Sequence, residues 1–294
     1  MRTSRTLLAA AVAVAVATTV VACSNTGDDG SGGHAGHGAA PSASSASSPA
    51  GEHAGMPGMG DDSLSATRNG YTLTAKDPGQ TGGIAFTITG PDGKPVTDVV
   101  DEQTEPMHLY LVRSDLTGFQ HVHPKAAADG SWTAPIAAPL PGDYRVYTQV
   151  IPKAAEKDGA IILSTPVSVA GLGKDATAPL PPAAASATAG EFGVTVAGTP
   201  KAGTESRLSI SISRGGAPET ALQPYLQSFA HVTAIHEGDL ALSHLHPVGG
   251  PATGTGGPTV EVDALFGTPG NYRLFVQFQV DGQVRTVPIT VAVS

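Results

Sequence analysis

Short apolar segments separated by Gly, Pro and Asp turns dominate the chain from about residue 67 to its end. Segments such as Tyr71–Ala75 and Ile84–Thr89 alternate apolar and polar residues, which is the two-residue period of a half-buried β-strand. Helical periodicity is nearly absent. Strands of this length, with turn signals between them, predict antiparallel β-sandwiches with immunoglobulin-like or cupredoxin-like strand order. The other strands are expected at Met107–Arg113, Phe119–His123, Asp143–Val150, Ile161–Val169, Phe192–Ala197, Arg207–Ser213, His231–His236, Leu240–His246, Val260–Leu265, Asn271–Val280 and Val284–Val293.

Two stretches poor in large apolar residues divide the chain into folded and unfolded parts. The segment after Cys23 is rich in Gly, Ser, Ala and Pro and cannot bury enough surface to fold. A Pro/Ala-rich stretch later in the chain has the composition of a linker. We therefore predict an all-β protein with two tandem antiparallel β-sandwich domains after a signal peptide and a disordered tether. The expected boundaries are 1–22 for the signal peptide, 23–66 for the tether, 67–170 for the first sandwich, 171–188 for the linker and 189–294 for the second sandwich.

The two predicted sandwiches are copies of one unit. Met107–Pro124 aligns without a gap on Ala230–Pro247, and Pro141–Val150 matches Pro269–Phe278. Most aligned positions differ between the copies. Three histidines, the proline that follows them and a Pro-Gly-x-Tyr-Arg motif are the same in both. These repeated positions are therefore the candidates for a shared structural or chemical role.

The N-terminal residues predict export and a lipid anchor. Arg2 and Arg5 precede an apolar run, Leu7–Ala22, that is typical of a secretory signal and too short to span a membrane. Cys23 is the only cysteine, and its position after small and apolar residues resembles the lipobox of bacterial lipoproteins. The resemblance implies acylation of Cys23 and an extracytoplasmic protein that is lipid-anchored to the cell membrane. A plain secreted protein with a chance cysteine is the alternative.

Charge and cysteine content narrow the choice of function. The net charge is −9, and the chain has no cluster of Lys and Arg, which argues against a nucleic-acid surface because phosphates would be repelled. One cysteine cannot form an intramolecular disulfide, so the folded parts depend on their apolar cores. Neither observation favours an enzyme of a particular class.

The repeated histidines are expected to converge. His121 and His123 point to the same face of a strand, because side chains alternate along it. If the preceding segment forms a hairpin with its turn at Ser114–Thr117, His108 lies opposite His123, at a distance that imidazole rings can bridge. The same register in the second copy brings three further histidines together. The predicted metal ligands are His108, His121 and His123 in the first copy and His231, His244 and His246 in the second.

Three neutral imidazoles form a suitable site for Cu(II) or Zn(II), and ligand type alone also allows Ni(II). Copper is the predicted ion, with zinc as the alternative and with a fourth position open to water or another ligand. Met107 falls on the opposite face from His108, and we do not expect it to be a ligand. Imidazole and thioether groups also occur in the tether, where they form a weaker predicted site. These groups are His34, His37, His53, Met56 and Met59.

A structural role for the histidines is the main alternative. Leu109, Leu111 and Val112 make both faces of the first histidine strand apolar, as in an inner strand of a sandwich. A histidine in such a strand is often a packed residue that bonds a backbone carbonyl. Three clustered imidazoles are harder to explain in this way, because they repel if protonated and leave donors unmatched if buried. Binding of a protein partner through the histidines is a third hypothesis.

The second copy resembles a module of bacterial exported and membrane proteins. The stretch "LQPYLQSFAHVTAIHEGDLALSHLHP", followed by "PGNYRLFVQFQVDGQVRTVPIT", carries a histidine in the first hairpin strand and His-x-His-Pro in the second. That module is uncharacterised and often occurs beside copper-handling components. The resemblance implies copper buffering or delivery outside the membrane, with a membrane copper transporter as a candidate partner. The first copy lacks the residues equivalent to Leu222, Pro224 and Tyr225, and is the more diverged.

Two resemblances raise an enzyme as a further alternative. The stretch "GFQHVH" (Gly118–His123) resembles a strand of copper/zinc superoxide dismutases, but that family also needs a disulfide. Cupin enzymes use His-x-His followed by a glutamate, and no glutamate follows either copy closely. We therefore expect a metal-binding protein without enzymatic activity. An immunoglobulin-like interaction module with structural histidines is the second choice, and a metalloenzyme is the third.

Overall fold

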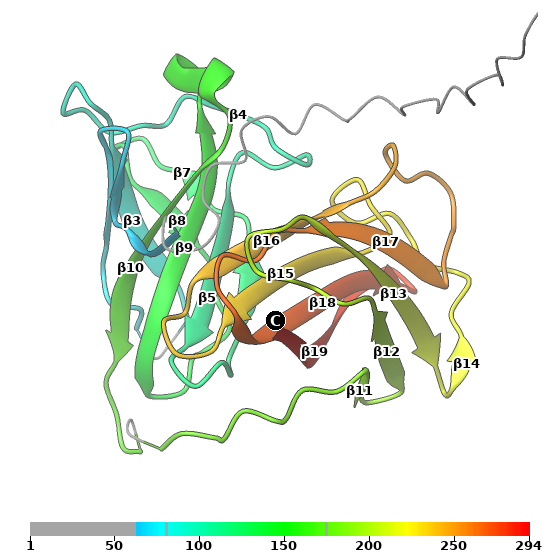
Figure 1. Cartoon of the computed structure of the whole chain (residues 1–294). Helices are drawn as coiled ribbons and strands as arrows, with labels where there is room; N and C mark the ends of the chain where they lie inside the picture. Colours follow the sequence, from blue (N-terminus) through cyan, green and yellow to red (C-terminus); the bar gives the residue numbers. More distant parts are fainter. Residues whose placement is uncertain (1–62, 80–81, 174–175) are drawn as a thin grey trace, which may run out of the picture. The chain divides into compact units, whose positions relative to one another are not determined.

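The computed structural model describes residues 63–79, 82–173 and 176–294 (Figure 1). Almost every described element is a β-strand, so the predicted all-β class is confirmed. None of the helices formed by the described residues is long and apolar enough to cross a membrane. The predictions for the signal peptide, for Cys23 and for the histidines and methionines of the tether lie outside the described residues.

The first repeat forms two antiparallel sheets. One has the order β1-β2-β3-β8-β7, and the other has the order β10-β9-β5-β6 with β4 paired to β9. An apolar core that includes Phe86, Trp132 and Leu163 fills the space between the layers. Two packed layers of this kind are the expected sandwich. The strands are β1 (Thr67–Arg68), β2 (Tyr71–Ala75), β3 (Ile84–Thr89), β4 (Val99–Val100), β5 (His108–Arg113), β6 (Gln120–Val122), β7 (Lys125–Ala126), β8 (Trp132–Ala134), β9 (Gly142–Pro152) and β10 (Ile161–Val169).

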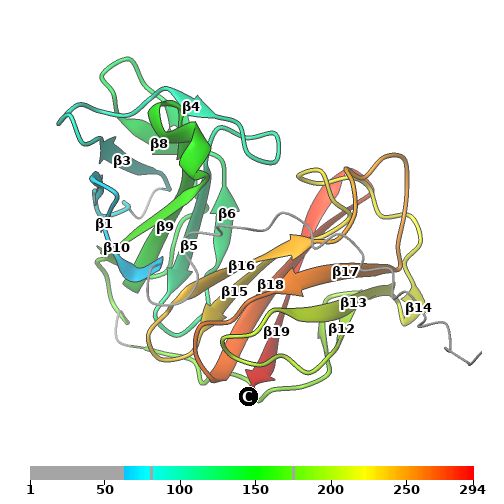
Figure 2. The ribbon, with the colours of Figure 1, turned by 45° about the horizontal axis from the view of Figure 1, so that its top comes forward.

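The second repeat has the same layers, but its strands join into one continuous antiparallel sheet. The order is β11-β12-β13-β17-β16-β15-β18-β19, with β14 paired to β13 (Figure 2). Strand β16 pairs with β15 over most of its length and with β17 at His246 and Pro247, so it belongs to both layers. The strands are β11 (Ser186–Ala189), β12 (Phe192–Ala197), β13 (Ser206–Arg214), β14 (Ala217–Pro218), β15 (His231–His236), β16 (Leu242–Pro247), β17 (Thr259–Ala264), β18 (Gly270–Val280) and β19 (Gln283–Val293).

The structure differs from the sequence expectation mainly in short elements. The sequence pattern did not indicate β8, because three residues are too few to show a two-residue period. Strand β11 begins inside the stretch expected to be linker, and its sequence, Ser-Ala-Thr-Ala, contains no large apolar residue. A 3₁₀-helix, η2 (Lys153–Asp158), lies between the last two strands of the first repeat, where the second repeat has only Asp281 and Gly282.

Strand β5 is buried along its whole length, on both faces. Leu109 and Leu111 point into the core of their own sandwich, as the alternation of side chains requires. Tyr110 and Val112, on the other face, belong to a separate apolar cluster that also contains residues of the second repeat. The two repeats therefore pack through the outer faces of their histidine-bearing sheets. The buried members of this inter-repeat cluster are Tyr110, Val112, Leu116, Tyr147, Ile162, Ile235, Leu242 and Phe275.

Candidate metal centre

The hairpin β5–β6 has the register that the sequence predicts. Tyr110 lies opposite His121, and the turn closes with a hydrogen bond of 3.0 Å from the Arg113 amide to the Thr117 carbonyl. The second repeat has the equivalent register, with Thr233 opposite His244. In each copy the first histidine and the two histidines of the next strand therefore start from the same end of one hairpin.

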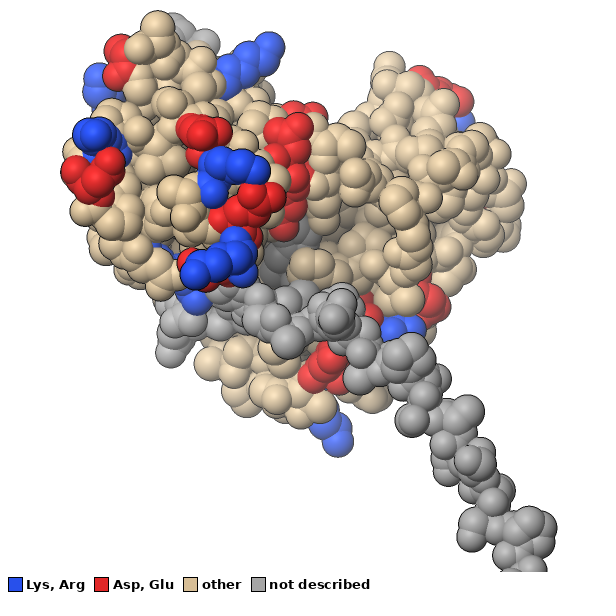
Figure 3. All heavy atoms as spheres, turned by 90° about the horizontal axis from the view of Figure 1, so that it is seen from above, with Lys and Arg blue, Asp and Glu red and all other residues tan. Residues whose placement is uncertain are grey.

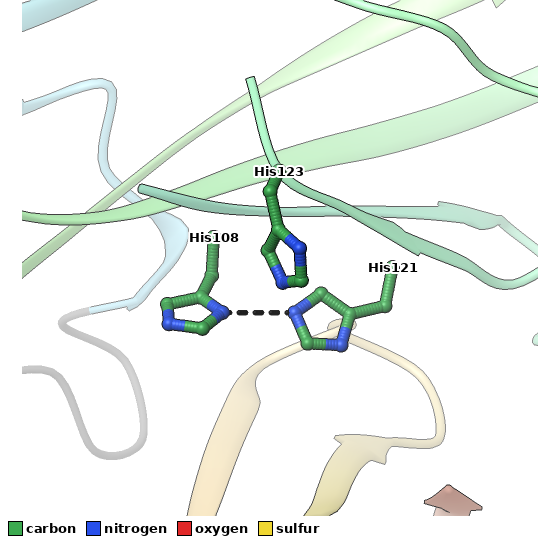
Figure 4. A group of neighbouring side chains, drawn as sticks. All are labelled: His108, His121 and His123. Carbon is green, nitrogen blue, oxygen red and sulfur yellow. Dashed lines mark hydrogen bonds between the residues drawn. The ribbon is translucent and has the colours of Figure 1, made fainter. Parts of the chain in front are cut away.

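Three imidazoles of the first repeat meet at this end. His108, His121 and His123 each offer one ring nitrogen, and these three atoms lie within 4.8 Å of one another. The closest pair is His108 Nδ1 and His121 Nε2, which are 3.0 Å apart (Figure 4). The rings are 5.0–5.2 Å apart between centroids, and the ring of His123 is nearly perpendicular to the other two. Among the described residues this is the one group of three or more His, Cys, Asp or Glu side chains arranged to hold an ion.

The other nitrogen of each ring faces a hydrogen-bond acceptor. His108 Nε2 lies 3.0 Å from the Glu102 carbonyl oxygen, and His121 Nδ1 lies 2.8 Å from Gln277 Oε1. His123 Nδ1 faces the Glu105 carboxylate at 3.5 Å. Carbonyl and carboxylate oxygens only accept hydrogen bonds, so these three nitrogens carry the ring protons. Imidazole ligands of metal ions are oriented in the same way, by an acceptor at the nitrogen that does not bind the ion.

Lone pairs therefore point into the centre of the cluster. A neutral imidazole has one protonated nitrogen, so His108 Nδ1 and His121 Nε2 are both acceptors and face each other without a proton between them. His123 Nε2 is buried and has no hydrogen-bond partner. Buried acceptors left in this way are unfavourable unless a cation lies between them. Nitrogens about 2.0–2.1 Å from a shared tetrahedral ion are about 3.3 Å apart, so the closest pair, at 3.0 Å, is near the spacing that an ion requires.

A proton is a poor candidate for that cation at neutral pH. Burial lowers the pKa of His108 to about 4, even though its bond to the Glu102 carbonyl acts in the opposite direction. Burial, followed by the charges of His108 and His123, places the pKa of His121 well below its usual value. The pKa of His123 is also lowered by burial. All three rings are therefore neutral at pH 7, which is the form that binds metal ions.

A strained turn supplies the acceptor for His108. Reciprocal backbone bonds of 2.9 and 3.0 Å between Glu102 and Glu105 close a two-residue turn. Gln103 and Thr104 have φ angles of 50° and 75°, a conformation that usually selects Asn or Gly. Residues held in this region cost about 1–3 kcal/mol each. The turn places the Glu102 carbonyl beside the His108 ring, and the sequence did not indicate it because both central residues are atypical.

The same turn precedes the first histidine of the second repeat. Tyr225 and Ser228 exchange backbone bonds of 2.7 and 3.1 Å around Leu226 and Gln227, whose φ angles are 51° and 65°. The Tyr225 ring packs edge-on against the ring of His231, at 6.4 Å between centroids. The turn occurs before the first histidine in both copies, and neither copy has glycine at its centre. It is therefore a feature of the repeat.

Packing alone explains the other repeated motif. The Tyr144 hydroxyl donates to the Leu140 carbonyl at 2.9 Å, and Tyr272 makes the equivalent bond at 3.0 Å. A side chain at Gly142 would overlap the Arg113 guanidinium. The aligned glycine, Gly270, leaves the same room for His236. The Pro-Gly-x-Tyr motif thus has its hydrogen bonds satisfied within the fold, whereas the histidine motif of the first repeat leaves its inner nitrogens unmatched.

The second repeat places its first histidine beside the first triad. His231 is 1% exposed, its Nε2 lies 3.3 Å from the Tyr110 hydroxyl, and its ring stacks on His121 at 4.7 Å. His246 lines a surface pocket together with Glu261. The side chain of His244 lies outside the described part of the chain, so a triad in the second repeat stays a prediction. Met107 is fully buried in the first core, as its position on the opposite face from His108 implies.

Charged side chains make up 14% of the chain, and several of them pair with one another on the surface. The face seen in Figure 3 is mostly uncharged, and its charged side chains form mixed acidic and basic groups as well as one group that is acidic alone. Pairs such as Arg207–Asp263 and Lys153–Glu156 neutralise one another locally.

Three solved structures show a remote likeness to this chain. Fibronectin(III)-like modules of CbhA from Clostridium thermocellum are 13% identical, cover 76% of this chain and 94% of theirs, and give a TM-score of 0.21. Domains 4 and 5 of the S-layer protein SbsC are 9% identical, and the match covers 78% of this chain and 98% of theirs with a TM-score of 0.21. Salmonella alpha-2-macroglobulin is 14% identical, and the match covers 81% of this chain and 16% of that protein with a TM-score of 0.24. Scores this low carry no argument about function.

The family assignment rests on the sequence of both repeats. A search of curated proteins finds no match. One family model matches residues 66–163 and again residues 187–294, which contain both histidine hairpins. These segments make up more than half of the chain, and they coincide with the two sandwiches described above. The chain therefore belongs, through both of its repeats, to the family described as a domain of unknown function, DUF8832.

Proposed function

We propose that this protein is an extracytoplasmic, membrane-anchored metal-binding lipoprotein that buffers or delivers copper. The observation that carries the proposal is the inward-facing set of nitrogens in the first repeat: His108 Nδ1 and His121 Nε2 at 3.0 Å, and His123 Nε2 with no partner. The predicted export signal and the lipobox-like position of Cys23 support a location outside the cytoplasm. A membrane copper transporter is the expected partner in delivery.

Imidazole-only ligation favours Cu(II) and Zn(II) over hard cations such as Mg²⁺ and Ca²⁺, which prefer oxygen ligands. His108 is buried, whereas His121 and His123 are half-buried, so one side of the cluster can reach solvent. Three protein ligands leave a coordination position for water or for a ligand from a partner. An ion held in this way can be exchanged, which suits a buffer or a donor better than a permanent structural site.

The direct test is a metal titration of the mature protein. Cu(II) and Zn(II) binding to the wild type is compared with the variant His108→Ala, His121→Ala, His123→Ala by calorimetry and by elemental analysis after gel filtration. The matched control is His236→Ala, because His236 already pairs with Asp239 at 2.7 Å. We expect the triple variant to lose one tightly bound ion and the control to keep it. An unchanged stoichiometry in the triple variant would remove the proposal.

A structural role for the histidines is the second candidate, and one observation favours it. His231 stacks on His121 and reaches the Tyr110 hydroxyl, so histidine rings also take part in the packing between repeats. On this hypothesis the protein is an immunoglobulin-like interaction module, and it binds its partner equally well with and without a metal chelator. A superoxide assay on copper-loaded protein tests the enzyme alternative.

A further inference from the structure

The side chain of Gln277 connects the second repeat to the metal centre of the first. It extends from β18, is 5% exposed, and places Oε1 2.8 Å from His121 Nδ1, 156 positions away in the sequence. Its amide nitrogen faces Thr286 Oγ1 at 3.5 Å. On its own sheet Gln277 is the cross-strand neighbour of His231. The second repeat therefore supplies the acceptor that fixes the ring proton of His121.

The position of that proton decides whether the site is open. If His121 carried its proton on Nε2, it would donate to His108 Nδ1, 3.0 Å away, and both nitrogens would be lost to an ion. With the proton on Nδ1, Nε2 keeps its lone pair and faces the centre of the cluster. The bond to Gln277 Oε1 favours this second tautomer, because an amide oxygen requires a donor. Gln277 thus prevents a hydrogen bond between His121 and His108 from closing the site.

Two ring contacts also join the repeats, one of them at His121 itself. The ring of His231 stacks on His121 at 4.7 Å with an interplanar angle of 26°. Phe119 of the first repeat stacks on Phe275 of the second at 4.0 Å with an angle of 6°. Phe275 lies two residues before Gln277 on β18, so the contact that joins the repeats and the contact that orients His121 share one strand.

We propose that the metal site of the first repeat is completed by the second repeat, with Gln277 as the residue that positions His121. The proposal rests on the proposed function, which supplies the ion. Because the bond crosses the boundary between the repeats, packing of the repeats and occupancy of the site stabilise each other. Thermodynamic linkage requires the same coupling free energy in both directions.

The test replaces Gln277 in the full chain. Gln277→Leu removes the acceptor at similar volume, Gln277→Glu keeps an acceptor oxygen, and Gln279→Leu makes the same change two residues further along β18. Affinity for Zn(II) is measured by competition with a chromophoric chelator, and Co(II) absorption reports the ligand set. We expect Gln277→Leu to bind about 10- to 100-fold more weakly, as for other residues that orient a metal ligand. Gln277→Glu and Gln279→Leu are expected to stay close to the wild type.

A second measurement separates this proposal from the metal-binding proposal. Long-range ¹H–¹⁵N NMR of the metal-free protein reports which nitrogen of His121 carries the proton. We expect Nδ1–H in the wild type and a shift toward Nε2–H in Gln277→Leu. If the wild type binds no metal, the proposed function fails, and the NMR result still decides the role of Gln277. Wild-type Nε2–H, or a leucine variant with unchanged tautomer and affinity, overturns the inference. Gln277→Ser provides the same comparison if the leucine variant does not fold.

Discussion

Lowering the pH should destabilise the metal-free protein through His108. Burial lowers the pKa of this ring from 6.5 to about 4, so the folded state holds it neutral over a range in which the unfolded chain is protonated. Stability therefore rises with pH, because the unfolded state binds more protons. The contribution is complete above about pH 6.5 and is lost as the pH falls to about 4. Since His108 is fully buried, solvent does not screen the effect.

The magnitude follows from the size of the shift. A difference of about 2.5 pKa units, at about 1.36 kcal/mol per unit, is about 3 kcal/mol. Small domains are stable by only about 5–15 kcal/mol. The titration of this single ring would therefore remove a large part of the free energy of unfolding. The pKa of His121 is lowered by the same cause and adds to the loss. The pKa of Glu102 is raised by burial, which works in the opposite direction because a buried carboxyl is favoured in its protonated form.

The assay is urea denaturation of chelator-treated protein at pH 7, 6, 5 and 4, for the wild type and His108→Gln. Glutamine does not titrate, and its Nε2 can still donate to the Glu102 carbonyl that His108 Nε2 faces. We expect the wild type to lose about 3 kcal/mol more than the variant between pH 7 and pH 4. If the free energy of unfolding falls with pH by the same amount in both proteins, the reasoning is refuted, because the remaining titrating groups are common to both.

Four further outcomes are expected from the same geometry. His123→Ala should weaken Zn(II) binding at least about 10-fold in calorimetry while changing the free energy of unfolding by less than about 1 kcal/mol, because this half-buried ring leaves Nε2 unpartnered. Thr104→Gly should raise the melting temperature, since relief of a left-handed β-branched residue stabilises by about 1 kcal/mol. Gly142→Ala should cost about 2 kcal/mol or more in urea denaturation, because the new Cβ overlaps the Arg113 guanidinium, whereas Gly215→Ala meets no neighbouring atom and should cost less. Zn(II) at about 100 times its dissociation constant should raise the free energy of unfolding by about 2.7 kcal/mol, and no shift would contradict metal binding.

The hairpin at the candidate metal centre could be predicted because its determinants are local. His121 and His123 share a face through the two-residue period of a strand, and the turn near Ser114–Thr117 fixes their partner in the preceding strand. The bounds of β2, β3 and β10 follow for the same reason. The alternation of residues is sufficient wherever one strand and its neighbour are close in sequence.

The parts that were missed depend on contacts distant in sequence. The apolar outer face of β5 indicated a cover but not its identity, and Gln277 resembles any other polar residue of a long strand. The turn at Gln103 and Thr104 lacks the glycine that normally marks it. The sequence of one repeat does not show that the other repeat packs against it. For this reason the acceptor for His121 could be identified only from the three-dimensional structure.

Duplication has left the two copies of the motif under different mechanical constraints. In the first repeat β6 ends at Val122 and β7 begins at Lys125 in the opposite layer, so His123 sits at a corner between sheets. In the second repeat β16 runs through the corner, and His246 is paired with Asp263 in the ladder. Movement of the main chain at His123 therefore breaks fewer ladder hydrogen bonds than the same movement at His246.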